Sequence, residues 1–306
     1  MYRSYFLVVT LALTTTACSD YGMNALQATE EAPRDTGLYE EEADTGFTNV
    51  TEEEELVDTG SGIVEPPPED DCEDTSELIY VIDREDEALY LFNPPTLSFE
   101  FLGDLDCGVY SGTPASMSVT RDGVAYVRYS DNTLYGVDLQ TMNCEPTSYE
   151  TSFGSFGMGY ATETQGAWQD DLYIANSNQI AIVNTNTWNL TMLGQLPSQS
   201  ELTGNSDGEL WAVLPLETPA SIVQIDVGTG HTTKTLTLNG MPNPRNIDTF
   251  AFATWGGDFW LFIRENGMGE STDVYKVNNS GNMSKVVSGT GLNIVGAGVS
   301  TCAPTN

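Results

Sequence analysis

A frame of alternating strands and turns recurs five times in this chain. It is clearest at residues 172–196, LYIANSNQIAIVNTNTWNLTMLGQL, where an aromatic-bearing strand is followed by a polar turn, a strand ending in Asn or Asp, and a further apolar strand. The residues that end the second strand are Asn93, Asp138, Asn184, Asp226 and Asn278, at intervals of 45, 46, 42 and 52. Such a period is typical of β-propeller blades. The sequence therefore predicts an all-β propeller over residues 75–306, with five blades of four antiparallel strands.

The first predicted blade is incomplete. It begins at Leu78 on its aromatic strand, LIYVID, and has no inner strand before it. A glycine-rich strand at the other end, residues 293–300 (NIVGAGVS), has no partner of its own. We expect this C-terminal strand to become the inner strand of blade one, because closing the ring removes exposed sheet edges.

Residues 1–17 are typical of a secretory signal peptide. Arg3 precedes an apolar stretch from Tyr5 to Leu13, and small residues lead to Cys18. The stretch is too short for a stable transmembrane helix. The segment TTAC, residues 15–18, resembles the bacterial lipobox, in which the cysteine is lipidated and becomes the first mature residue. This predicts lipid attachment at Cys18; cleavage after Ala17 without lipidation is the alternative.

Residues 18–74 are predicted to be a disordered acidic linker. Between Ser19 and Glu77 the chain has twenty acidic residues and one basic residue, Arg34, with few large apolar groups and a Pro triplet at 66–68. Such a segment cannot bury enough apolar surface to offset its loss of conformational entropy. The whole chain has a formal net charge of -35 and a pI near 4.1, which argues against nucleic acid as a partner.

Export makes disulfides the default state for the four cysteines that follow Cys18. Cys72 lies just before the first strand and Cys302 just after the last, whereas Cys107 and Cys144 flank the outer strands of blades one and two. This placement predicts a Cys72–Cys302 and a Cys107–Cys144 disulfide. A zinc site is not expected, because there is no CxxC spacing and the single histidine, His231, lies in a turn.

The segment LYIANSNQIAIVNTNT resembles the YVTN repeat of lactonase-like bacterial propellers, whose pattern runs L-Y-V-T-N, a gap, and V-x-V-I-D-x-x-T. IYVIDREDEALYLFNPPT and AYVRYSDNTLYGVDLQT follow it more loosely. The resemblance covers roughly residues 78–290 and implies blade packing, with no catalytic residue to carry over. Members of this family include lactonases, secreted binding proteins and surface-layer components.

Ligands of a propeller are expected on the face where the blade-to-blade loops meet the turns between the two middle strands. The turns contribute Asp83, Arg84, Asp131 and Asn178. The predicted ligand-binding residues are Tyr110, Phe153, Phe156, Arg245 and Arg264. Aromatic rings and arginines are what a sugar or carboxylate site uses. The alternative is that the two phenylalanines pack between blades and the arginines neutralise carboxylates. Four tryptophans are interpreted as core rather than as a ligand platform; these are Trp168, Trp188, Trp255 and Trp260.

No catalytic residue, metal site or cofactor is predicted, because the sequence has no triad, metal-ligand cluster or phosphate loop. The sequence favours a lipid-anchored lipoprotein of the bacterial cell envelope, at the outer rather than the inner membrane. Its propeller would act as a binding or scaffold module for an envelope polysaccharide or protein. The alternatives are a lactonase-like or glycan-modifying hydrolase and a structural envelope component.

Overall fold

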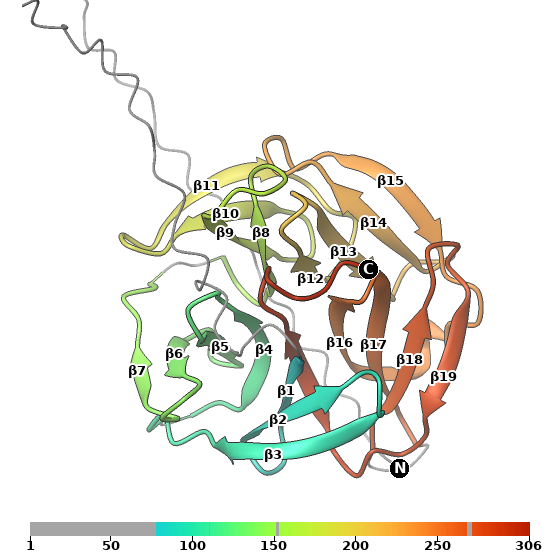
Figure 1. Ribbon diagram of the computed structural model, residues 1–306, viewed down its shortest axis with the longest axis horizontal. Coiled ribbons are helices and arrows are strands. Elements are labelled where there is room, and N and C mark those ends of the chain that lie inside the picture. The colour runs from blue at the N-terminus through green and yellow to red at the C-terminus, as the bar shows by residue number, and fades with distance from the viewer. Residues whose placement is uncertain (1–77, 110, 151–152, 268–270) are drawn as a thin grey trace, which may run out of the picture. The chain divides into compact units, whose positions relative to one another are not determined.

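The computed structural model describes residues 78–109, 111–150, 153–267 and 271–306. Within them the strands form five four-stranded antiparallel sheets arranged as the blades of a ring (Figure 1). The predicted signal peptide, Cys18, the acidic linker, Cys72 and Tyr110 lie outside the described residues, so these predictions stay as they are. The described residues contain no helix long and apolar enough to cross a membrane.

Each blade is a short meander from the centre of the ring outward. Blade two consists of β4 (Pro114–Val119), β5 (Val124–Tyr129), β6 (Leu134–Asp138) and β7 (Cys144–Pro146). Blade three consists of β8 (Gly157–Thr162), β9 (Asp170–Ala175), β10 (Ile180–Asn184) and β11 (Asn189–Gly194). Blade four consists of β12 (Glu201–Gly204), β13 (Leu210–Leu214), β14 (Ser221–Ile225) and β15 (Thr232–Thr237). A 3₁₀ turn, η2 (Pro244–Asn246), leads into blade five, which consists of β16 (Ile247–Trp255), β17 (Asp258–Glu265), β18 (Asp273–Val277) and β19 (Met283–Val287).

Blade one is closed by the C-terminal strand, as predicted. Its order is β20 (Ile294–Gly298), β1 (Ile79–Asp83), β2 (Ala88–Asn93) and β3 (Ser98–Asp104). β20 runs antiparallel to β1, with Tyr80 opposite Gly298 and Asp83 opposite Ile294. The ring therefore has no unpaired inner edge at its seam.

The core lies between the blades. Among the described residues, buried apolar side chains form five clusters, and each cluster joins two neighbouring blades. The cluster between blades five and one, for example, combines Ile79 and Phe92 with Trp260 and Phe262. Because each strand presents alternate residues to opposite faces, the apolar alternation of the sequence fills the clusters on both sides of a blade.

Glycines let the inner strands approach one another closely. A Cβ atom on Gly157 of β8 would lie 2.2 Å from the carbonyl oxygen of Ser200, and one on Gly204 of β12 would lie 2.4 Å from that of Tyr160. The predicted tight turns at Asp122-Gly123 and Asp207-Gly208 are present, with φ of 78° and 75° at the two glycines.

The Cys107–Cys144 disulfide is present, with the two Cα atoms 5.0 Å apart. It links the segment after β3 to the first residue of β7, and so joins the outer parts of blades one and two. The proposed Cys72–Cys302 pairing stays a prediction because Cys72 lies outside the described residues.

Candidate functional site at the centre of the loop face

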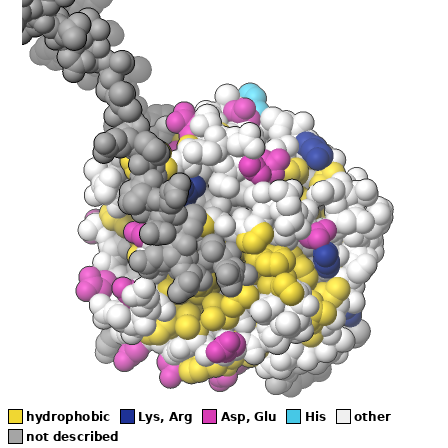
Figure 2. Space-filling model, viewed as in Figure 1, with side chains coloured by type: hydrophobic (Ala, Val, Ile, Leu, Met, Phe, Trp, Pro, Cys, Tyr) yellow, Lys and Arg dark blue, Asp and Glu magenta, His cyan; other side chains and the backbone are white. Residues whose placement is uncertain are grey.

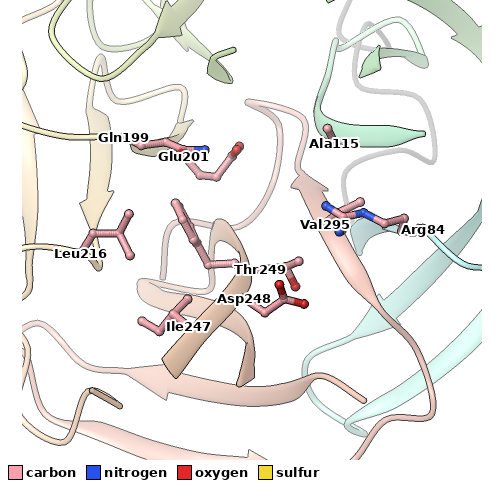
Figure 3. Close-up of a pocket in the computed structure, with 10 residues that line it drawn as sticks. Arg84, Ala115, Gln199, Glu201, Leu216, Ile247, Asp248, Thr249 and Val295 are labelled. Carbon is pink, nitrogen blue, oxygen red and sulfur yellow. The ribbon is translucent and has the colours of Figure 1, made fainter. Parts of the chain in front are cut away.

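We call the side of the ring that carries the blade-to-blade loops and the turns between the two middle strands the loop face. The inner strands β4, β12, β16 and β20 all begin on this face, and the β1–β2 turn adds Arg84. Together they form a pocket of about 130 Å³ at the centre of the ring (Figure 3). It is lined by Arg84, Ala115, Gln199, Glu201, Leu216, Ile247, Asp248, Thr249, Phe250 and Val295.

Arg84 is the basic group of this pocket. Its backbone N–H donates to the Asn293 carbonyl (2.9 Å), which fixes the turn against β20. Its side-chain Nε is buried and has no hydrogen-bond partner among the described residues. In Figure 3 the side chain extends into the pocket from the right-hand wall. A buried guanidinium N–H without a partner costs free energy, which an anionic ligand would recover through a charge-assisted hydrogen bond.

Glu201 lies in the opposite wall of the pocket and is 4% exposed. Ser116 donates a hydrogen bond to its Oε2 (2.8 Å). Burial raises the pKa of Glu201 to about 8, although the Ser116 hydrogen bond, the Arg128 charge and the Met158 backbone N–H act in the opposite direction. At neutral pH this carboxyl is therefore mainly protonated, and it adds little negative charge to the pocket.

Arg128 completes the buried polar group behind the pocket. Its guanidinium donates to the carbonyl oxygens of Phe156 (2.8 Å), Tyr129 (3.0 Å) and Ala115 (3.4 Å) and lies 5.4 Å from the centroid of the Phe156 ring. Burial lowers its pKa, partly offset by Glu201. These contacts tie blade two to blade three, so Arg128 positions the pocket wall instead of facing the opening.

Asp248 is the ionisable acid beside Arg84 in the lining. Its Oδ2 lies 3.5 Å from Nε of Arg264, whose Nη1 lies 3.8 Å from Oε1 of Glu85. Arg264 therefore neutralises carboxylates at the rim. The Glu85 side chain is 69% exposed, so the contact contributes little to stability. For Arg264 the charge-neutralising alternative fits these contacts better than direct ligand binding.

The other predicted site residues are dispersed. Phe156 is fully buried in the cluster between blades two and three, against Tyr149 and Met158. Phe153 packs on the same cluster, with its ring centroid 6.0 Å from that of Phe156. Both rings therefore match the packing alternative, because the hydrophobic side of blade three draws them inward. Arg245 lies exposed in η2, just before β16.

Two groups of the pocket are hard to select from the sequence. Arg84 is recognisable as a turn residue of this face, and its signal is a basic residue within the acidic turn Asp83–Asp86. Glu201 was not singled out, and its signal is a charged residue opening a strand of small and apolar residues, ELTG. Conversely, one tryptophan assigned to the core is on the surface: Trp168 is 46% exposed, whereas Trp260 is buried. Figure 2 shows the loop-bearing and blade surfaces of one side of the ring, where apolar and acidic side chains alternate with few basic ones.

The described residues contain no group of three or more His, Cys, Asp or Glu side chains placed to hold a metal ion. No protein-family model matches the chain, and no curated protein matches it. Among solved structures, a chain in the crystal structure of a nidogen/laminin complex is 10% identical over 74% of this chain and 99% of that chain, with a TM-score of 0.47. A chain in the crystal structure of a mitotic checkpoint complex is 13% identical over 74% and 82%, with a TM-score of 0.42. Similarities at these scores carry no argument about function, and the propeller assignment rests on the sheet topology.

Proposed function

We propose that this protein is an exported, lipid-anchored binding module of the bacterial cell envelope. The module would hold a carboxylate-bearing group of an envelope polysaccharide or protein in the central pocket of the loop face. The proposal combines the predicted leader and Cys18, the YVTN-like repeat pattern, and the unpartnered Nε of Arg84 in the pocket.

The observation that carries the binding proposal is Arg84. The chain has 45 acidic and 10 basic residues, so basic side chains have many carboxylates available for pairing. Arg121, Arg264, Lys276 and Lys285 all form ion pairs within the described residues. The Nε of Arg84 instead remains without a partner at the wall of a pocket. A preformed pocket with such a group is suited to a carboxylate, which guanidinium binds in a planar geometry.

The size of the pocket indicates what part of a ligand enters. Its volume of about 130 Å³ is below the roughly 300–1,000 Å³ typical of sites for whole small molecules. We therefore expect one terminal or side group of a larger partner to be held there, with the rest lying across the loop face.

The test is binding of the full exported chain to oligogalacturonate and to its methyl-esterified form, measured by calorimetry. We expect the acid form to bind and Arg84→Gln to weaken binding by about 1.5–3 kcal/mol, the range for a hydrogen bond to a charged group. Lys285→Gln, which removes the same charge on outer strand β19, should leave the affinity within experimental error. Equal affinity for the acid and the ester, or an unchanged Arg84→Gln variant, would contradict the proposal.

Glu201 favours one second candidate, the glycan-modifying hydrolase. A carboxyl held protonated near neutral pH is what a general acid requires. Against this, Glu201 is almost fully buried and is engaged by Ser116, Arg128 and Met158, which suits a group that ties strands together. Turnover of a glycan that is lost in Glu201→Gln would favour the enzyme over the binding module.

A further inference from the structure

A second concave site lies on the opposite side of the ring, where the turns between inner and second strands meet the C-terminal tail. We call this side the tail face. The site is a groove of about 520 Å³ between blades two and three, within the roughly 300–1,000 Å³ of small-molecule sites. It is lined by Thr120, Arg121, Asp122, Val124, Tyr126, Tyr160, Trp168, Asp170, Thr185 and Asn186. None of these residues lines the central pocket.

Trp168 forms an aromatic wall of this groove. It is one of four large apolar side chains that are exposed in the described part of the chain, at 46%. The backbone around it is fixed: Nη2 of Arg121 donates to the carbonyl of the preceding residue, Ala167 (3.0 Å), whose N–H donates to the Thr164 carbonyl (3.0 Å). An exposed indole on an anchored loop loses little conformational freedom when a ligand stacks on it.

The anchor of this loop is itself rigid. Nε of Arg121 lies 3.0 Å from Oδ1 of Asp170 and 2.9 Å from Oγ1 of Thr301, and Thr301 donates to Oδ2 of Asp170 (2.6 Å). Thr301 is fully buried and belongs to the C-terminal tail. One network therefore holds blade two, blade three and the tail together and sets the floor of the groove.

The remaining lining is polar but carries little net charge. Asp170 is neutralised by Arg121, which leaves Asp122 as the unbalanced charge among the lining residues. Asn186 is exposed and Thr185 half-buried in the β10–β11 turn, and the ring of Tyr126 packs edge-on against Trp188 at 5.4 Å. Hydroxyl, amide and carboxylate groups thus surround aromatic ring faces, without an unpaired cation among the lining residues that would attract an acid.

We propose that this groove is a binding site for a neutral saccharide of one or two pyranose units, with Trp168 as the stacking platform. The C–H face of a pyranose ring packs on an indole, while its vicinal hydroxyls both donate and accept. Asp122 accepts hydrogen bonds from hydroxyls, and the amide of Asn186 can do both. The negative charge of Asp122 disfavours uronic acids, so the two faces of the propeller would take ligands of different charge.

The experiment uses the full chain, screened against an array of neutral oligosaccharides that includes N,N′-diacetylchitobiose, cellobiose, maltose and xylobiose, followed by calorimetry and tryptophan fluorescence. We expect saturable binding with a blue shift of the emission. Trp168→Ala should raise the Kd by about tenfold, whereas Trp168→Phe, which keeps an aromatic face, should stay within about threefold of wild type. Asp122→Asn keeps the turn geometry but removes the charge, and should weaken binding severalfold.

Two control variants distinguish binding in this groove from binding elsewhere on the propeller. Met192→Ala removes a side chain of similar exposure (48%) from outer strand β11 of the same blade and should leave the Kd unchanged. Arg84→Gln should also leave neutral-sugar binding unchanged, so the groove can be established even if the loop-face proposal fails. Failure to bind any neutral glycan on the array, a preference for uronates, or full binding by Trp168→Ala would overturn the proposal.

Discussion

Glu201 is a carboxyl group buried at the start of β12, where the neighbouring inner strands carry mainly small, apolar or hydroxyl side chains. Its hydrogen bond from Ser116 and its proximity to Arg128 reduce the cost of burial but do not remove it, because its pKa is still raised to about 8. A group that prefers the proton in the folded state makes stability depend on pH.

This raised pKa predicts a stability loss toward alkaline pH. The folded protein binds the Glu201 proton up to pH about 8, whereas the unfolded chain releases it near pH 4.5. Between these values the unfolded state binds fewer protons, so the free energy of unfolding falls as pH rises, by up to about 1.4 kcal/mol per pH unit from this group. Glu201→Gln cannot titrate, and denaturant unfolding should show it gaining on wild type from pH 5 to 8. A constant difference between the two proteins across that range would mean that Glu201 is ionised throughout.

The positions of single residues were the hardest feature to predict from sequence. Strand alternation correctly indicated that Phe262 or Trp260 would be buried, because burial within a strand follows the period of two. Phe156 and Trp168 lie just outside strands, where no period applies, and were assigned the wrong way round: the first is core and the second exposed. Their burial depends on the neighbouring blade and on the Arg121 anchor, which are distant in sequence.

At the scale of elements, the seam between β20 and β1 is the feature that the sequence predicted best. The missing inner strand of blade one and the unpartnered glycine-rich strand at residues 293–300 required each other, and the structure pairs them. The central pocket was less accessible to prediction. It is assembled from the starts of four inner strands and one turn, and the sequence shows that these meet only once the ring geometry is known.

The seam is held by more than strand pairing. The N–H of Asn293 donates to Oδ1 of buried Asp83 (2.6 Å), and Thr249 of blade five donates to the Ile294 carbonyl (3.1 Å). Ile294 is fully buried in the cluster between blades five and one. β20 thus serves both blades, so its loss exposes the edge of β1 and part of two core clusters.

Deletion of residues 292–306 is therefore expected to abolish cooperative thermal unfolding and to cause aggregation, measured by circular dichroism and light scattering. Removal of residues 305–306 alone is the matched control and should leave the transition nearly unchanged. Placing residues 292–300 in front of Leu78 through a short Gly-Ser linker supplies the same strand from the other direction and should restore a cooperative transition. A deletion variant that melts like wild type would show that β20 is dispensable for closure.

At the scale of the whole molecule, charge determines how the protein meets surfaces. Residues 78–306 contain 25 acidic and 8 basic residues, and the segment before them is more acidic still. Such a chain is repelled by anionic lipid and by polyanions at long range. Binding of an acidic group at Arg84 must therefore overcome this repulsion, and salt should speed the association by screening it.

The same repulsion makes the predicted anchor at Cys18 testable without ambiguity. Nothing else in the charge pattern favours adsorption to a membrane, so lipid chains at Cys18, each buried CH₂ contributing about 0.8 kcal/mol, would carry the whole membrane affinity. Cys18→Ser should move the protein from the detergent phase to the soluble fraction after phase separation of whole-cell extracts. Ser19→Ala, one residue further on, keeps the cysteine and should stay in the detergent phase. Wild-type protein found in the soluble fraction, with a mass matching cleavage after Ala17 and no added lipid, would show that the leader is an ordinary secretion signal and that the propeller is released.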